Sequence, residues 1–503
     1  MADDTHRQLQ WVVDDFGRVV GVQQRALMPF LAPTAGVPDA NAPVTGVLAS
    51  DVSTGTLLTP PDVVAGAFEM PLISGPSAPP PTFWPKKRNL GLFTTAAAAA
   101  TALTGGATKS NDTSDPYIGN TASSAYPANM GTSPLITLGS GGAVTAIPGT
   151  VPLPALNLTG CNVYLAFKVL PGGASGPGSI TAGIRLYTGA TVNASGGNYL
   201  QCTRVNWNAT LEWQVLGFAI EDFVAVGAAQ LSDITAITHA GARLGGVTVG
   251  TQIALGGLFI CPKQLDRAAA VIAFDDCRAD TWTDASFELA RRGFPGTLFP
   301  GAVAAMLRAG PDQFQMSVAQ MQKLCRLHGW QVASQAWSTE NPPFGGSQAM
   351  SEMASQRALW VALGLNGGGM GSYFSNNSPN ALDWKAARRT NFPMGMRGFN
   401  VGASGSITAK AVLPETFPIA DPNYVTALGI DLNVNTAADL VNFASYAAAS
   451  RGLAIFVFHV IPSGNAGQFA KFTALLDYLD SRRDAIEVCT YERAIQQGYS
   501  YPL

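Results

Sequence analysis

The chain has 503 residues, enough for two or three domains that each bury a core. Only 13% of its residues are charged and 47% are hydrophobic, with 54 glycines and 33 prolines, which favours compact, loop-rich β structure over helical bundles and over disorder. The 30 basic and 33 acidic residues leave a net charge of −3, which argues against a nucleic-acid-binding protein.

Mean hydropathy is mildly positive at +0.16, but no run of about 18 apolar residues is present to cross a membrane. The first residues are acidic and polar, so we expect no secretory signal peptide and synthesis in a cytoplasm. The six cysteines have no CxxC spacing, and we expect isolated, buried thiols.

The N-terminal part divides into two segments. In residues 1–27, two β-branched runs between Trp11 and Val22 flank a turn at Gly17, which predicts a β-hairpin. Because such a hairpin is only marginally stable alone, we expect it to dock onto a partner or a neighbouring copy. Residues 28–115 are rich in proline, glycine and alanine, which predicts an extended connector with short strands.

Residues 116–264 consist of short β-like segments separated by glycine, asparagine and serine turns. This spacing predicts an antiparallel β-sandwich, of the jelly-roll kind. Tyr199, Trp207 and Trp213 are candidates for stacking on sugars, and packing in the core of the sandwich is the alternative for these rings.

Residues 265–503 alternate strands with helices, which predicts an α/β domain, a barrel or a partial one. The expected strands are 268–274, 330–334, 453–460 and 486–490. The expected helices start with a cap at Thr283 and Asp284, with capping boxes at Ser317 and Thr436, and near Phe469.

Two adjacent acids, Asp275 and Asp276, end the apolar strand 268–274. Functional sites in α/β folds lie at this end of the strands. Two neighbouring carboxylates repel each other when both are ionised, unless a cation or a hydrogen-bond network stabilises them. One acid as a metal ligand and the other as a general base is one interpretation, and a strand-end turn that caps a helix is the other.

The segments AVIAFDDCRAD, GFPGTLFPG, GWQVASQAWST and IFVFHVIPSG occur in the order found in the polysaccharide deacetylase (NodB-like) family, which residues 268–503 resemble. The resemblance implies an incomplete (β/α) barrel with its cleft at the strand ends. It also implies Asp275 as general base, Asp276 as the first metal ligand and His459 as general acid.

The second motif departs from that pattern. The family carries two metal-binding histidines four residues apart, where this chain has Gln335 and Thr339. Amide and hydroxyl oxygens are poor zinc ligands, and the remaining His328 falls at the end of a helix. The segment 371–379 also lacks the arginine usual in the family. We therefore expect no cofactor and degenerate catalysis, with a zinc-dependent deacetylase as the alternative.

A cleft without metal chemistry suits glycan binding, and Trp337, Tyr373, Asn376 and Asn377 offer stacking and hydrogen bonds there. Trp337 as a packing residue is an equal alternative.

The whole layout resembles bacteriophage tail fibre, tailspike or other virion-surface proteins. That resemblance implies an N-terminus bound to other virion proteins, a C-terminal domain that meets host surface glycan, a homotrimer, and a virion location reached by lysis of the host. A bacterial, non-viral carbohydrate-binding protein is a further alternative. No nucleic-acid or membrane partner is expected.

Overall fold

The computed structural model describes residues 11–13, 19–22, 88–91, 108–112, 133–137, 151–170, 179–188, 198–208, 214–245, 252–263, 265–300, 315–335, 358–365, 370–372, 395–401, 413–420 and 425–499. Within these ranges, no helix is both long enough and apolar enough to cross a membrane.

The predicted N-terminal hairpin is present as an antiparallel pair of strands, β1 (Trp11–Val13) and β2 (Val19–Val22). Most of the segment expected to be a connector lies outside the described residues. Its two described strands, β3 (Arg88–Gly91) and β4 (Thr108–Asp112), pair with later strands of the chain, β13 and β5.

Two antiparallel sheets form the β-rich part of the molecule. The six-stranded sheet has the order β10-β7-β13-β5-β4, with β3 also paired to β13, and the five-stranded sheet has the order β11-β9-β8-β12-β6. The bounds of these strands are β5 Ser133–Thr137, β6 Val151–Leu156, β7 Cys161–Leu170, β8 Ser179–Tyr187, β9 Tyr199–Asn208, β10 Gln214–Ala219, β11 Val224–Val226, β12 Ile237–Gly245 and β13 Gln252–Pro262. Two 3-10 helices, η3 (Ile220–Asp222) and η4 (Leu231–Ala236), connect strands.

Alternate residues of the two sheets meet in one hydrophobic core. Leu165 and Phe167 of β7 belong to it together with Ile184 and Leu186 of β8 and Ile237 of β12. Because side chains alternate between the faces of a strand, the intervening residues of β8 lie on the opposite face of its sheet.

The C-terminal half contains an eight-stranded parallel sheet of order β16-β15-β14-β20-β19-β18-β17, with β21 also paired to β14. Its strands are β14 Ala268–Asp275, β15 Thr297–Phe299, β16 Gln331–Val332, β17 Met370–Ser372, β18 Gly395–Val401, β19 Val425–Ile430, β20 Leu453–Phe458 and β21 Ile486–Val488. The two edges meet, because Ser334 and Gly371 form a parallel bridge and the Ser372 N–H donates to the Ser334 carbonyl at 2.8 Å.

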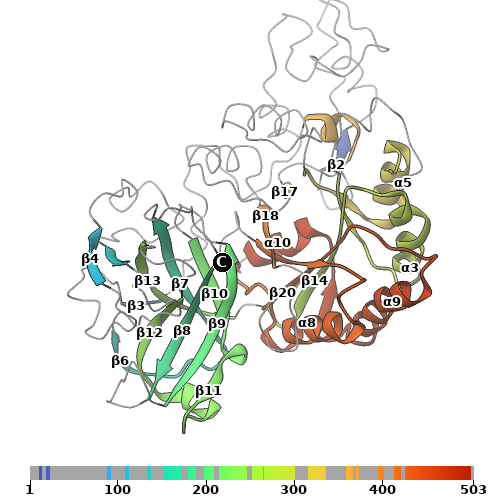
Figure 1. Ribbon diagram of the computed structural model, residues 1–503. Coiled ribbons are helices and arrows are strands. Elements are labelled where there is room, and N and C mark those ends of the chain that lie inside the picture. Colours follow the sequence, from blue (N-terminus) through green and yellow to red (C-terminus); the bar gives the residue numbers. More distant parts are fainter. Residues whose placement is uncertain are drawn as a thin grey trace, which may run out of the picture.

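Every residue of β14 is buried, as the continuous apolar run predicts. Ala270, Ile272 and Phe274 pack against the helices outside the sheet, whereas Ala269 and Val271 face a second core that includes the C-terminal helix α10. We call these the outer and inner faces of the sheet. The helices are η5 Thr281–Ala285, α3 Ser286–Arg291, α5 Val318–His328, α8 Ala437–Ser450, α9 Ala466–Ser481 and α10 Tyr491–Tyr499. Figure 1 shows α3, α5, α8 and α9 on the outside of the parallel sheet.

The predicted capping boxes are confirmed. The Ser317 hydroxyl accepts the Gln320 N–H at the start of α5, Gly329 ends that helix with a φ of 65°, and Thr436 and Asp439 form the same box at α8. The predicted cap at Thr283 and Asp284 is wrong. Both residues lie inside a short π-helix, η5, which continues directly into α3.

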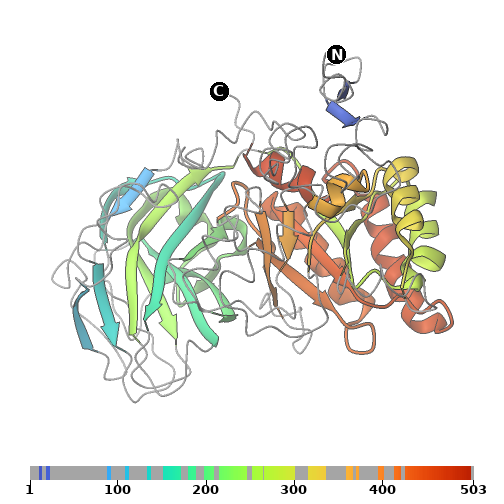
Figure 2. The same ribbon diagram turned by 90° about the horizontal axis from the view of Figure 1, so that it is seen from above.

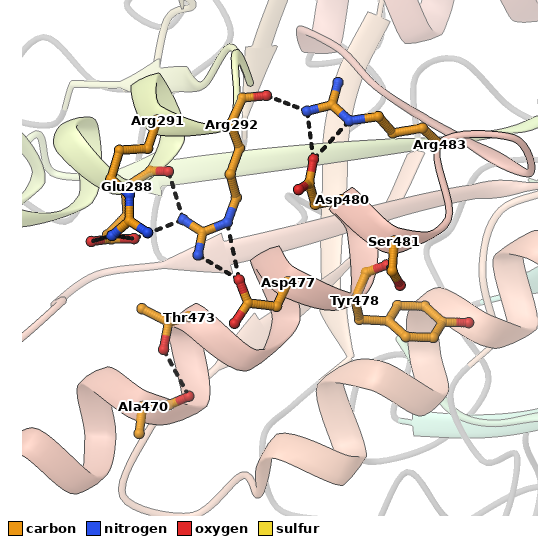
Figure 3. A network of polar contacts seen from close by, with 10 residues as sticks. All are labelled: Glu288, Arg291, Arg292, Ala470, Thr473, Asp477, Tyr478, Asp480, Ser481 and Arg483. Atoms are coloured by element: carbon orange, nitrogen blue, oxygen red, sulfur yellow. Dashed lines mark hydrogen bonds and ion pairs between the residues drawn. The ribbon is translucent and has the colours of Figure 1, made fainter.

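An ion-pair network joins α3 to α9 (Figure 3). The Arg292 guanidinium lies between the carboxylates of Glu288, at 2.7 Å, and Asp477. Arg483, just after the end of α9, donates to the Asp480 carboxylate and to the Arg292 carbonyl. The side chains of Arg292 and Glu288 are each 9% exposed, so this pair is shielded from solvent and fixes the helix that follows β14.

Residues 413–420 form a strap that joins the two halves, which lie side by side in Figures 1 and 2. On one side, Glu415 pairs through both backbone hydrogen bonds with Leu453, the first residue of β20. On the other, Asn162 and Tyr164 of β7 donate to the carbonyls of Phe417 and Pro418, each at 2.8 Å. The β-rich part therefore joins the parallel sheet at the beginning of β20, opposite the end that carries the predicted site.

Candidate functional site

The predicted site residues that the structure describes lie at the carboxyl ends of three strands of the parallel sheet. Asp275 is the last residue of β14, His459 follows β20, and Gln335 lies three residues after β16. The residues two positions before them, Ala273, Val457 and Ala333, all belong to the inner core. Alternation along a strand therefore brings the three side chains to the inner face at one end of the sheet.

Asp275 and His459 lie near each other. His459 Nε2 is 3.9 Å from Asp275 Oδ2, and the side chains are 46% and 2% exposed respectively. A buried carboxylate thus lies next to an accessible imidazole. The distance is too long for a direct hydrogen bond, although a protonated imidazole at this position interacts favourably with the carboxylate charge.

Asp276 occupies a sharp turn. Asp276 and Cys277 have φ values of 62° and 46°, a left-handed conformation that aspartate tolerates better than most residues and that cysteine rarely adopts. The Asp276 N–H donates to the Phe299 carbonyl at 3.0 Å and lies 3.5 Å from the Gln335 side-chain oxygen. The Gln335 side chain is therefore beside the main chain of Asp276. Backbone strain of this kind persists where surrounding structure enforces it.

Two carboxylates that sequence reasoning missed hold the loop that carries His459. Asp280 Oδ2 accepts the Ile461 N–H at 2.9 Å, and Asp284 Oδ2 accepts the Ser463 N–H at 3.3 Å. Burial raises the pKa of the Asp280 carboxyl above its ordinary value, and the hydrogen bond from Ile461 opposes that rise. The only signal in the sequence was the excess of acids shortly after the strand.

The remaining predicted residues, Thr339, Trp337, Tyr373 and Asn376, lie outside the described residues. Strand β17 ends at Ser372, directly before Tyr373, and its partner across the joined edges is Ser334, directly before Gln335. The positions of Tyr373 and Asn376 relative to Asp275 stay predictions.

Within the part of the chain that the structure describes, the groups beside Asp276 do not make up a zinc site. Zinc in proteins is held by imidazole nitrogen, thiolate sulfur and carboxylate oxygen, and its sites take at least three protein ligands. The neutral amide of Gln335 lies beside the main-chain N–H of Asp276. Among the described residues, no group of three or more histidine, cysteine, aspartate or glutamate side chains is placed to hold a metal. What remains is a hydrogen-bonding site of carboxylate, imidazole and amide groups.

No protein-family model matches the chain, and no curated protein matches its sequence. Solved structures that resemble it are carbohydrate esterases and deacetylases, aligned with the C-terminal half. The Xyl-CE4 domain of a multidomain xylanase from the hindgut metagenome of Trinervitermes trinervoides is 14% identical, with a TM-score of 0.30, over 47% of this chain and 94% of that one.

A family 4 carbohydrate esterase from Streptomyces lividans is 13% identical, with a TM-score of 0.29, over 47% of this chain and 97% of the esterase. A peptidoglycan deacetylase from Bacillus subtilis is 10% identical, with a TM-score of 0.30, over 46% and 92% of the two chains. Similarity at this level does not establish membership of a family.

Proposed function

We propose that residues 265–503 form a polysaccharide-deacetylase-like domain that binds a glycan and does not hydrolyse it with zinc. The observation that carries this proposal is the position of the Gln335 side-chain oxygen, 3.5 Å from the main-chain nitrogen of Asp276. By the family resemblance, Gln335 occupies the motif position of one imidazole, and an amide oxygen is a poor zinc ligand.

The site retains groups that suit a sugar. The Asp275 carboxylate accepts hydrogen bonds from hydroxyl groups, the accessible His459 imidazole both donates and accepts, and the Gln335 amide does the same. Asp280 and Asp284 hold the His459 loop in place, which lowers the entropic cost of binding. Such a site recognises hydroxyl groups without activating a water molecule.

The fold supports the same proposal. Two antiparallel sheets that share one core are consistent with a β-sandwich, and a parallel sheet whose edges meet between helices and α10 is consistent with an incomplete (β/α) barrel. We further propose that the chain is a virion protein that attaches to host surface glycan, as a homotrimer whose N-terminal hairpin contacts other virion proteins. The hairpin β1–β2 and the order of the segments along the chain support this part.

The first test measures acetate release from acetylated capsular, lipopolysaccharide and peptidoglycan substrates, with zinc, with EDTA and with neither. We expect no metal-dependent release from the wild-type chain, and binding to at least one of these glycans that Asp275→Asn and His459→Ala weaken. Zinc-dependent turnover abolished by Asp275→Asn would establish the alternative, an active deacetylase, which the proximity of Asp275 and His459 favours.

The virion assignment is tested separately, by quantifying the protein in purified particles. Stoichiometric presence supports it, and absence from the particles refutes it without affecting the proposal for the glycan cleft.

A further inference from the structure

The five-stranded sheet of the β-rich part carries a polar cluster on the face turned away from its core. Ala182, Ile184 and Leu186 of β8 point into the core, so Gly183, Arg185 and Tyr187 lie on the other face. The pairing register places residues of β9 and β12 beside them. We call the arginine patch the set formed by Arg185, Tyr187, Tyr199, Gln201, His239 and Arg243.

The two arginines of the patch are diagonal neighbours. Arg185 pairs with Gly241 and Arg243 pairs with Gly183 across β8 and β12, so a glycine stands opposite each arginine. Diagonal positions on one face of an antiparallel pair lie within reach of long side chains. With no side chain opposite either of them, both guanidinium groups share the same area of the sheet.

No carboxylate compensates this pair of charges among the described residues. The Arg185 Nε donates to the neutral Gln201 side-chain oxygen at 2.8 Å, and its guanidinium lies 4.2 Å from the centroid of the Tyr199 ring. The Arg243 side chain forms no hydrogen bond or ion pair with the described residues. Burial lowers the pKa of Arg243, and the positive charge of Arg185 lowers it further. Two like charges held close without a counter-charge are unfavourable unless an anion joins them.

A buried hydroxyl also lacks an acceptor. Tyr187 is 1% exposed, and within the described residues its Oη finds no hydrogen-bond acceptor, although the Arg185 side chain lies close enough to act on it as a donor. Its ring lies 5.7 Å from that of Tyr199, next to the Arg185 guanidinium, and across β12 it pairs with His239. Buried hydroxyls normally find an acceptor, and the acceptor that suits a phenol beside two guanidinium groups is an oxyanion.

We propose that the arginine patch binds an oxyanion, a carboxylate or sulfate group, carried by an acidic saccharide. Arg243 and His239 are partly exposed and form the accessible side, with Arg185 and Tyr187 behind them. The partly exposed Tyr199 ring and Gln201 amide supply further contact for a sugar ring. Only the choice of a saccharide as the carrier rests on the proposed function. The patch itself is separate from the site at Asp275, because it lies on the five-stranded sheet and not on the parallel sheet.

The test uses the full chain and compares three variants. Arg243→Gln and Arg243→Glu change the partly exposed arginine, whose side chain forms no hydrogen bond or ion pair with the described residues. Arg326→Gln, an exposed arginine on α5, is the control with the same change in charge. The probes are sodium sulfate, D-glucuronate and polygalacturonate, with dextran as the neutral polymer, measured by calorimetry at low and high salt.

We expect polygalacturonate to bind, and glucuronate and sulfate to compete with it. Arg243→Gln should weaken binding by about tenfold or more, Arg243→Glu should abolish it, and Arg326→Gln should leave it unchanged. Binding should also weaken as salt rises. The proposal is overturned if polygalacturonate does not bind, if only the free ions bind, if dextran binds equally well, or if Arg243→Gln binds like the wild type. Because Asp275→Asn leaves the patch intact, loss of glycan binding in that variant and loss in Arg243→Gln report on different sites.

Discussion

Arg204 is one of the side chains that join the two halves of the molecule. It lies on β9, is 4% exposed, and its guanidinium donates four hydrogen bonds, two to the Gly217 carbonyl and one each to those of Leu413 and Pro414. The distances are 2.9 to 3.1 Å. Arg204→Met keeps most of the volume and removes every donor.

The expected cost follows from these contacts. Three buried carbonyl groups lose a charged donor, and a buried group left without its hydrogen bond costs about 1 kcal/mol or more, so we expect a loss of about 3 kcal/mol. Because two of those carbonyls belong to the strap 413–420, the loss should also separate the unfolding of the two halves. Differential scanning calorimetry and urea denaturation measure both effects.

The matched control is Arg291→Met, which removes an arginine with a 56% exposed side chain that pairs with Glu288 among the described residues. An ion pair with one partner in solvent contributes about 0.5 kcal/mol, so this variant should unfold almost like the wild type. If Arg204→Met is no less stable than Arg291→Met, the strap does not hold the halves together in the way described.

Three further outcomes are expected. Burial raises the pKa of Glu492 to about 7, so the folded chain holds a proton that the unfolded chain releases near 4.5. The free energy of unfolding should therefore fall as pH rises from 4.5 to 7, by about 3 kcal/mol in all. Urea denaturation between pH 4 and 8 should show this fall in the wild type and not in Glu492→Gln. Burial raises the pKa of Cys489 to about 12 and that of Cys277 well above its ordinary value, so neither thiol should react with Ellman's reagent until the chain is unfolded in guanidinium, and rapid labelling of either in the folded chain would contradict the burial described. Asp280→Asn should speed amide hydrogen exchange at Ile461, because a neutral amide oxygen is a weaker acceptor than a carboxylate, and unchanged exchange would show that Asp280 does not hold the His459 loop.

The parts of the fold that were predicted correctly depend on interactions between residues close in sequence. The apolar run of β14 indicates burial on both faces, and the capping boxes at Ser317 and Thr436 join residues three positions apart. These signals are local, because a hydrogen bond between a cap and its own helix needs no other part of the chain. The same applies to the β1–β2 pair.

The errors and omissions concern distant partners. Asp284 was interpreted as a helix cap, yet its carboxylate accepts a hydrogen bond from Ser463, 179 residues away. Asp280 reaches Ile461 across 181 residues. Arg204 was not singled out at all, because its acceptors are main-chain carbonyls that leave no pattern in the sequence.

The candidate site was predicted from motif order rather than from any local pattern. Strand β20 pairs directly with β14, and this pairing brings His459 to Asp275. No periodicity in either segment contains that information. The substitution at Gln335 was visible in the sequence, but its proximity to Asp276 depends on the order β16-β15-β14 in the sheet.

The central claim concerns the donor atoms around Asp276, and direct measurement of zinc tests it. The wild-type chain and the double variant Gln335→His with Thr339→His are each incubated with zinc, passed through a desalting column and assayed for bound metal, and crystals of both are examined by anomalous diffraction at the zinc edge. We expect no zinc retained at Asp276 in the wild type, and retention in the double variant, where two imidazoles restore the family pattern. A stoichiometric zinc ion between Asp276 and Gln335 in the wild type would contradict the account.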